Sequence, residues 1–138
     1  MNAKTLILGG ALVTALVGGA MAVPGPARAA DAIAFTPGNP WAQAIGTITK
    51  SDHYHDYSVH AIGGKTIKIN LISRDPNLYF RVQQADSRDS LVDTETSGET
   101  SWSTQPAADT DYTVRVFAEP ETLSSGDASK FALQVGIF

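Results

Sequence analysis

Residues 57–73 read Tyr-Ser-Val-His-Ala-Ile-Gly-Gly-Lys-Thr-Ile-Lys-Ile-Asn-Leu-Ile-Ser, two alternating segments on either side of a glycine pair. Apolar residues recur at every second position in both segments: Tyr57, Val59 and Ala61, then Ile67, Ile69 and Leu71. Period two is typical of β-strands with one buried face. Because Gly63-Gly64 supplies the backbone freedom for a tight reversal, the stretch predicts a β-hairpin.

The chain from residue 44 onward continues this alternation in short segments. No window of eleven residues has the spacing of an amphipathic helix. Further strands are predicted around residues 45–49, 78–83, 112–117 and 131–137, with a short one at Trp102. Turn residues such as Arg74-Asp75-Pro76-Asn77 separate them. The sequence therefore predicts an all-β protein, a small antiparallel β-sandwich of six to eight strands.

Two longer segments are polar and carry few apolar side chains. Residues 86–100 are expected to form loop or edge structure. Residues 119–130, with Pro120 and a Ser-Ser-Gly-Asp run, are expected to form a mobile connection. Loops of this kind often carry the binding residues of small sandwiches.

The first 29 residues have the order of a secretory signal peptide. Lys4 precedes the uncharged stretch 5–23, which is followed by Pro24-Gly25-Pro26 and then Ala27-Arg28-Ala29. A charged start, an apolar middle and a small-x-small site predict export with cleavage after Ala29. A membrane anchor is the alternative, because the apolar stretch is long enough to span a bilayer.

This interpretation divides the chain into three parts. Residues 1–29 are the signal peptide, residues 30–43 an extended N-terminal arm, and residues 44–138 the sandwich domain. The expected location is periplasmic or secreted, with no membrane attachment after cleavage.

Composition and charge exclude several function classes. The absence of cysteine excludes disulfides, thiol catalysis and cysteine-ligated zinc. The formal net charge is -4, and removal of Lys4 and Arg28 with the signal peptide makes it -6. Because no cluster of lysine and arginine exists, a nucleic-acid partner is not expected. The oligomeric state stays open.

Three histidines lie close together beside two aspartates: His53, His55 and His60, with Asp52 and Asp56. On an extended strand, His53 and His55 share one face while His60 lies on the other, so too few ligands converge for zinc or copper. Loop carboxylates could supply oxygen ligands to calcium, but their spacing is not that of an EF-hand. The carboxylates considered are Asp86, Asp89, Asp93, Glu95 and Asp127. We predict no metal site and no cofactor.

Enzymatic signatures are missing from the sequence. No Gly-x-Ser-x-Gly element marks a nucleophile. Asp109 and Asp111 would share a face, but they occur in a segment typical of a turn, where aspartate bonds to the local backbone. We therefore predict no catalytic residues and a protein that is not an enzyme.

Aromatic and basic residues suggest a binding surface. By alternation, Tyr57, Trp102 and Tyr112 belong to the core, whereas Tyr54, Tyr79 and Phe117 are the surface candidates. Arg81 and Arg115 share the outward positions of Tyr79 and Phe117. A basic and aromatic patch on an acidic protein can accept a carboxylate from a partner.

The order of motifs resembles bacterial pre-peptidase C-terminal domains. Those domains open with Gly, then Asp-x-Tyr, then a small apolar residue and Gly before an alternating strand. The run from Gly46 through His53-Tyr-His-Asp-Tyr57 to Gly63 and Ile67-Lys-Ile69 is similar, and Asp56 and Tyr57 match best. Residues 78–80, 106–116 and 131–135 resemble the remaining strands, so the resemblance covers residues 46–137.

A single exported domain with this layout is similar to the periplasmic inhibitors of g-type lysozyme. That resemblance implies a sandwich that blocks a muramidase by placing loop residues in its carboxylate-bearing cleft. Two segments depart from the pattern. Asp109-Thr110-Asp111 replaces a tight Ala-x-Gly-x-Tyr turn, and the connection before the last strand, basic in those inhibitors, is acidic from Glu119 to Asp127.

The leading hypothesis is an exported, non-catalytic binding protein that inhibits a g-type lysozyme by protein–protein contact. The alternative is a carbohydrate- or calcium-binding accessory module of the pre-peptidase type, so the partner is a protein or a glycan. The predicted partner-binding residues are Tyr54, Asp56, Tyr57, Tyr79, Arg81, Arg115 and Phe117.

Overall fold

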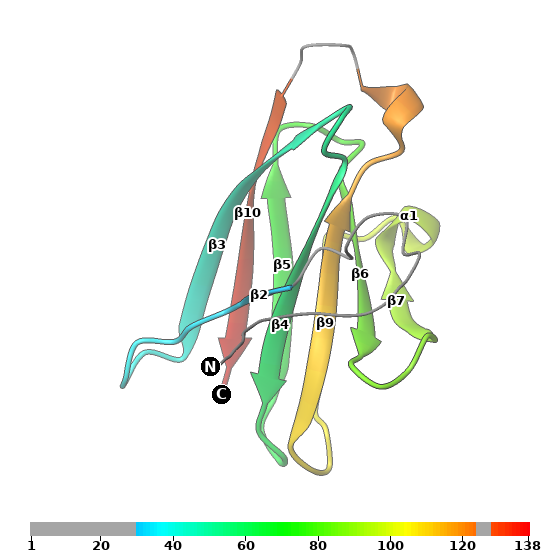
Figure 1. Ribbon diagram of the computed structural model, residues 1–138. Helices are drawn as coiled ribbons and strands as arrows, with labels where there is room; N and C mark the ends of the chain where they lie inside the picture. Colours follow the sequence, from blue (N-terminus) through cyan, green and yellow to red (C-terminus); the bar gives the residue numbers. More distant parts are fainter. Residues whose placement is uncertain (1–29, 124–127) are drawn as a thin grey trace, which may run out of the picture.

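The computed structural model describes residues 30–123 and 128–138, which fold into two β-sheets packed face to face (Figure 1). The four-stranded sheet has the order β3 (Trp41–Thr49), β10 (Ala128–Ile137), β5 (Ile67–Ser73) and β8 (Ser101–Thr104). The five-stranded sheet has the order β2 (Asp31–Ala32), β4 (Tyr54–Ala61), β9 (Thr110–Phe117), β6 (Tyr79–Gln84) and β7 (Ser90–Asp93). The predicted all-β sandwich is confirmed.

The described residues contain little helix. α1 is a single turn (Thr94–Ser97) and η1 is a 3₁₀ turn (Pro120–Thr122). Within the ranges 30–123 and 128–138, no helix is long and apolar enough to cross a membrane. The predicted signal peptide, residues 1–29, lies outside the described residues.

The core lies between the two sheets and consists of the side chains that alternate inward. The largest fully buried side chains in it are Phe80, Ile48, Ile67, Ile69, Leu133, Val59, Val82, Val114, Val116 and Val135. Burial of one such side chain contributes roughly 1.5–3 kcal/mol. The inward positions predicted for the segments at residues 57–61 and 67–71, and for Tyr112, are confirmed. Trp102 of β8 is partly buried and packs against Tyr112 at 6.1 Å between ring centroids.

The predicted hairpin at Gly63-Gly64 is wrong. β4 pairs with β9 and β5 pairs with β10, so the glycines connect the two sheets and do not join neighbouring strands. Both strands bury their inward side chains against each other across the sandwich, which a hairpin within one sheet would not allow. Gly64 has φ +82°, and a Cβ on Gly63 would lie 2.7 Å from the Ala108 Cα, so the glycines are required by this connection.

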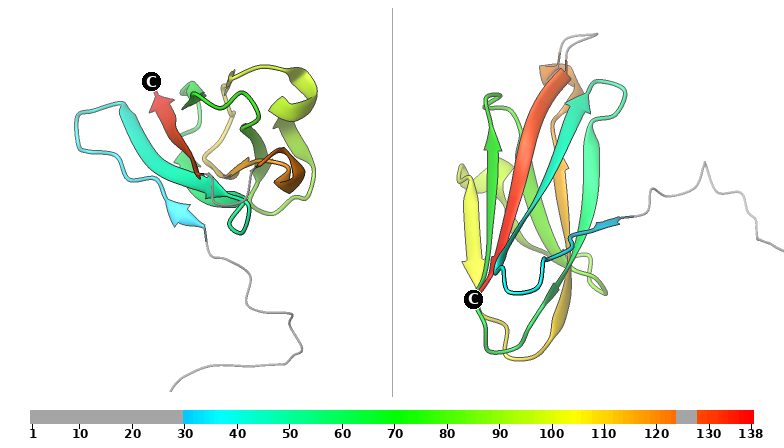
Figure 2. Two further views of the ribbon diagram at one scale, coloured as in Figure 1. Left: turned by 90° about the horizontal axis from the view of Figure 1, so that it is seen from above. Right: turned by 90° about the vertical axis from the view of Figure 1, so that its left-hand side faces the viewer.

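Most connections cross from one sheet to the other, as the view from above shows (Figure 2). Within the described residues, β6 and β7 form the sole pair of consecutive strands that are neighbours in one sheet. β2 is a parallel addition to β4, with Asp31 opposite Tyr57, and it brings the total to nine strands among the described residues.

Two segments differ in detail from expectation, and a third agrees with it. β3 begins at Trp41, so strand structure extends into the segment expected to be an extended arm. Residues 86–100 contain the edge strand β7 and α1, in agreement with the predicted loop or edge structure. The expected mobile connection at 119–130 contains η1 and the start of β10, and its residues 124–127 lie outside the described residues.

Thr94 in α1 completes the hydrogen bonding of β6 where β7 ends. Its Oγ1 accepts a hydrogen bond from the Phe80 backbone N–H at 2.8 Å and donates one to the Phe80 carbonyl at 3.1 Å. Thr94 is 1% exposed, so both backbone groups are shielded from water and depend on this hydroxyl. The side chain therefore substitutes for the next residue of an adjacent strand.

Substitution Thr94→Val keeps the shape of the side chain and removes both hydrogen bonds. We expect the free energy of unfolding to fall by about 1–3 kcal/mol, because buried backbone groups lose their partners. Thr96→Val, at an exposed position of the same helical turn, is the matched control and should change stability by less than about 0.5 kcal/mol. Equal denaturant midpoints for the two variants would contradict the role assigned to Thr94.

Candidate partner-binding site

Four charged side chains form a row across the outer face of the five-stranded sheet. In the strand register, Asp56 lies opposite Arg115, Arg115 opposite Arg81, and Arg81 opposite Asp93. We call these residues the charged row. Two arginines are therefore neighbours on adjacent strands, with a carboxylate on each side.

Arg115 and Asp56 make a bidentate pair. Arg115 Nε donates to Asp56 Oδ1 at 2.8 Å and Nη2 donates to Oδ2 at 3.0 Å. The guanidinium carbon also lies 4.2 Å from the centroid of the Tyr54 ring, at cation–π distance. The Asp56 side chain is only 12% exposed, and its hydrogen bonds to Arg115 raise the pKa of that guanidinium further.

Arg81 is held by a single bond to Asp93 and by an aromatic ring. Its Nε donates to Asp93 Oδ2 at 3.1 Å, and its guanidinium carbon lies 4.7 Å from the Phe117 ring centroid. The other oxygen of Asp93 accepts a hydrogen bond from the Glu95 backbone N–H and caps α1. Asp93 therefore links the charged row to the first turn of the helix.

An aromatic row runs beside the charged row. Tyr54 and Tyr79 both lie opposite Phe117 in register, on its two neighbouring strands. The rings of Tyr79 and Phe117 are 5.9 Å apart between centroids. The surface exposure predicted for Phe117 is wrong, because the side chain, with Tyr79 and Arg81 packed on its ring, is only 6% exposed. Phe117 therefore lies beneath Tyr79 and Arg81 and leaves little of its ring at the surface.

Tyr57 is also almost fully buried. It is 6% exposed and packs edge-on against Phe131, with ring centroids 6.3 Å apart. Burial and the nearby charge of Asp31 raise the pKa of its hydroxyl. The alternation assigned Tyr57 to the core, which is confirmed. Its predicted role in partner binding stays a prediction, and the buried ring offers little area for contact.

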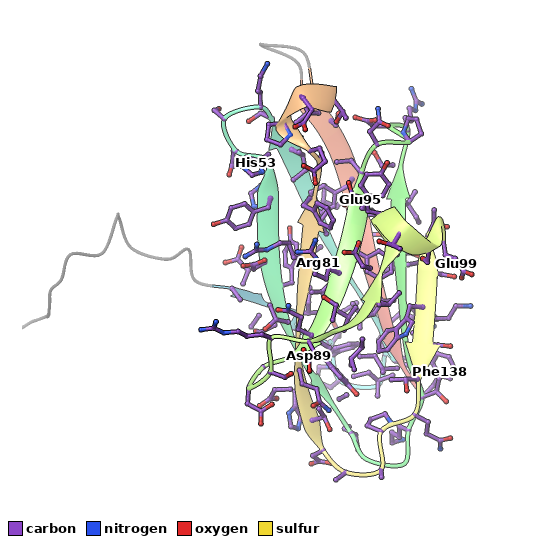
Figure 3. All side chains as sticks on the ribbon, turned by 90° about the vertical axis from the view of Figure 1, so that its right-hand side faces the viewer. His53, Arg81, Asp89, Glu95, Glu99 and Phe138 are labelled. Carbon is purple, nitrogen blue, oxygen red and sulfur yellow. The ribbon has the colours of Figure 1, made fainter. Side chains whose placement is uncertain are left out.

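A group of carboxylates borders the charged row at the α1 end. Figure 3 shows Arg81 on the sheet beside the helical turn that carries Glu95. Loss of hydration and the neighbouring acids Glu119 and Asp93 raise the pKa of Glu95, while Arg81 opposes that shift. Negative charge is therefore concentrated at this end of the sheet.

The predicted metal candidates are dispersed. His55 Nε2 lies 2.8 Å from the Thr47 carbonyl oxygen, on the inner side of β4, whereas His60 lies on the outer side. Asp93, one of the calcium candidates, is engaged by Arg81, and Asp127 lies outside the described residues. In the part of the chain that the structure describes, no three His, Asp or Glu side chains gather around a point that could hold a metal ion.

His60 and two aspartates form an ionic cluster that the sequence pattern does not indicate. His60 Nδ1 lies 2.6 Å from Asp111 Oδ1, and His60 Nε2 lies 3.7 Å from Asp109 Oδ2. Asp109 also accepts a hydrogen bond from the Gly63 backbone N–H at 2.9 Å. His60 and Asp111 lie 51 positions apart in the chain, so only the strand register brings them together.

Known proteins share this fold at low sequence identity. No family model matches the sequence, and no curated protein sequence matches it. The crystal structure of PliG from Aeromonas hydrophila, a periplasmic inhibitor of g-type lysozyme, is similar with a TM-score of 0.62. The match is 19% identical and covers 79% of this chain and 96% of that one.

Two further crystal structures also share the fold of this chain. PliG from Salmonella Typhimurium has a TM-score of 0.58 at 18% identity, covering 80% of this chain and all of that one. The pre-peptidase C-terminal domain of a Bacillus anthracis collagenase has a TM-score of 0.54 at 15% identity, covering 80% of this chain and 99% of that one. The chain has the fold of these proteins. The resemblance noted in the sequence is thus confirmed at the level of structure.

A double-mutant cycle tests the bidentate pair of the charged row. With Asp56→Ala and Arg115→Ala, we expect a coupling energy of about 1–2 kcal/mol, because the aspartate is nearly buried while the arginine is partly solvated. The pair Arg81–Asp93 has one bond and is the matched comparison, with a smaller coupling. Urea unfolding of the single and double variants provides the values, and coupling of zero for Asp56–Arg115 would contradict the geometry.

The titration of His60 tests its ionic cluster with Asp109 and Asp111. Its hydrogen bond to Asp111, with the charges of Asp111 and Asp109, raises the pKa of His60 above the ordinary value of 6.5. The interaction therefore stabilises the fold fully below about pH 6.5 and is lost as the pH rises through the raised pKa. Asp111→Asn should lower the pKa of His60 in an NMR titration, and Asp86→Asn should not. An unchanged pKa in the Asp111 variant would exclude the pairing.

Proposed function

We propose that this protein is an exported, non-catalytic binding domain that inhibits a g-type lysozyme by protein–protein contact. The main support is the sandwich fold, which extends over 96% of the Aeromonas hydrophila PliG chain. The proposal includes export by residues 1–29 to the periplasm or the outside of the cell, in keeping with the periplasmic inhibitors of the same fold.

The proposed contact surface is the outer face of β4, β9 and β6. Arg81 and Arg115 each have five N–H donors, and the flanking aspartates accept one and two of them. The remaining donors of two neighbouring guanidiniums can bind a carboxylate of the partner with charge-assisted hydrogen bonds. Tyr54 and Tyr79 flank them and add rigid aromatic contact area, which is typical of binding hot spots.

The acidic connection before β10 argues for this surface and against a contact by that loop. Glu119 and Glu121 lie in the η1 region, and Glu95 lies near Glu119. A carboxylate-bearing enzyme cleft would be repelled by this end of the sandwich. Binding by the arginine pair therefore requires a different orientation from the basic loop that the resemblance implies.

An inhibition assay tests the proposal. The purified protein should slow the lysis of bacterial cell walls by a g-type lysozyme at a near-stoichiometric ratio. Absence of inhibition at a large excess of the protein over the enzyme would reject the proposed function and leave the fold unaffected.

Two matched variants test the contact surface. Arg81→Gln removes a charge from the proposed surface and should raise the concentration for half inhibition by about tenfold, as expected for a charged contact worth about 1.4 kcal/mol. Arg88→Gln makes the same change in the exposed β6–β7 connection and should have little effect. Equal inhibition by both variants would exclude Arg81 from the interface.

A further inference from the structure

A groove lies on the outer face of the four-stranded sheet, on the opposite side of the sandwich from the charged row. Its volume is about 710 Å³. Its floor is formed by β3, β10 and β5, and its wall includes Thr36 and Asn39 of the segment that precedes β3. The right-hand view of Figure 2 shows this segment turning beside the base of β3, near the C-terminus.

Trp41 forms a flat aromatic surface in the groove. A Cβ on Gly136 would lie 2.8 Å from three ring atoms of Trp41, so the ring packs directly on the backbone of β10 at this glycine. Phe138 supports it at 5.7 Å between ring centroids. The side chain is nevertheless 39% exposed. The indole is therefore fixed on one side by the sheet and available to a ligand on the other.

Three amide side chains form a row next to Trp41. Gln43 lies opposite Gln134, and Gln134 lies opposite Asn70, on three adjacent strands. Gln134 Nε2 donates to Gln43 Oε1 at 3.3 Å, which keeps these two amides side by side. The Asn70 amide has no hydrogen-bond partner among the described residues, although it lines the groove. The amide row thus presents donors and acceptors that the fold itself does not use.

The groove carries little charge, which favours an uncharged, polar ligand. Lys68 is opposite Gly136 in register and is the sole charged residue among the described residues that line the groove. Its described lining residues include no carboxylate, although acidic residues outnumber basic ones in the chain. A flat aromatic ring beside uncharged amides suits a ligand with an apolar ring face and many hydroxyl groups at its edge.

We propose that this groove binds an oligosaccharide with extended β-linked pyranose rings. The C–H face of one sugar ring packs on Trp41, and hydroxyl or acetamido groups of the following rings bond to the amide row. Neighbouring strands are about 4.8 Å apart, so the three amides extend across about 10 Å of an extended glycan. This site is separate from the proposed lysozyme-binding surface and does not depend on it.

Calorimetric titration with two tetrasaccharides tests the site. Chitotetraose carries acetamido groups that can pair with the amide row, and cellotetraose carries hydroxyl groups alone. We expect the protein to bind chitotetraose and to bind cellotetraose more weakly. Trp41→Ala and Asn70→Ala should each weaken chitotetraose binding at least tenfold.

The control variant is Leu91→Ala. Leu91 is 46% exposed on β7 of the other sheet, so its truncation removes a comparable exposed apolar side chain away from the groove. This variant should bind chitotetraose like the unchanged protein. Thermal unfolding of all variants establishes that they fold. If Trp41→Ala does not fold, Asn70→Ala still tests the site.

Fluorescence provides an independent measurement. The chain has two tryptophans, so Trp102→Phe leaves Trp41 as the single indole. Chitotetraose should shift the emission of this variant to shorter wavelength because the sugar excludes water from the ring. The reciprocal variant, Trp41→Phe, reports on the partly buried Trp102 and should show no shift.

Three results would overturn the proposal. The first is that neither chitotetraose nor cellotetraose binds at millimolar concentration. The second is chitotetraose binding that neither Trp41→Ala nor Asn70→Ala weakens. The third is a loss of lysozyme inhibition in these two variants without any glycan binding, which would make the groove a protein contact. Failure of lysozyme inhibition in the unchanged protein would reject the proposed function alone.

Discussion

The alternation of side chains along β9 is the constraint on which both faces of the five-stranded sheet depend. Val114 and Val116 are fully buried between the sheets, so Arg115 between them must lie on the outer face. Because β9 is an interior strand, this arginine has a neighbour on each side, Asp56 on β4 and Arg81 on β6. Two arginines on adjacent strands repel each other unless carboxylates compensate them.

This requirement connects the charged row to the edge of the sheet. Asp56 compensates Arg115 from one side, and Asp93 compensates Arg81 from the other. Asp93 is also the cap of α1, and the next residue, Thr94, satisfies the backbone of Phe80. The same short segment therefore ends the edge strand, neutralises an arginine and completes the hydrogen bonding of a core strand. The outer faces of the two sheets differ in chemistry. The five-stranded sheet carries ion pairs, and the four-stranded sheet carries amides beside an indole.

The sequence was sufficient for the features that depend on local alternation. The inward positions of Val59, Ile69 and Tyr112 were predicted because period two directly reports which side chains share a face. The pairing of strands was not predictable in this way. The glycine pair at residues 63–64 was wrongly assigned to a hairpin, because a glycine turn suits a hairpin and a connection between two sheets equally well.

Features that depend on register were missed for the same reason. The contact of His60 with Asp111, and the amide row beside Trp41, join residues from strands distant in the chain. Five of the residues predicted to bind a partner lie on one face of the sheet, and their role in binding stays a prediction: Tyr54, Asp56, Tyr79, Arg81 and Arg115. Phe117 has the outward direction expected from alternation, but neighbouring side chains cover it, and alternation gives direction without exposure.

The proposed mode of binding is tested most directly by NMR titration of the labelled protein with a g-type lysozyme. The account predicts saturable shifts at an equimolar ratio in the Nε–H signals of Arg81 and Arg115 and in the ring signals of Tyr54 and Tyr79. Signals of the groove around Trp41, on the opposite sheet, should stay unchanged. Shifts confined to the groove or to residues 119–123, or no shifts at all, would contradict the assignment of the charged and aromatic rows as the inhibitory surface.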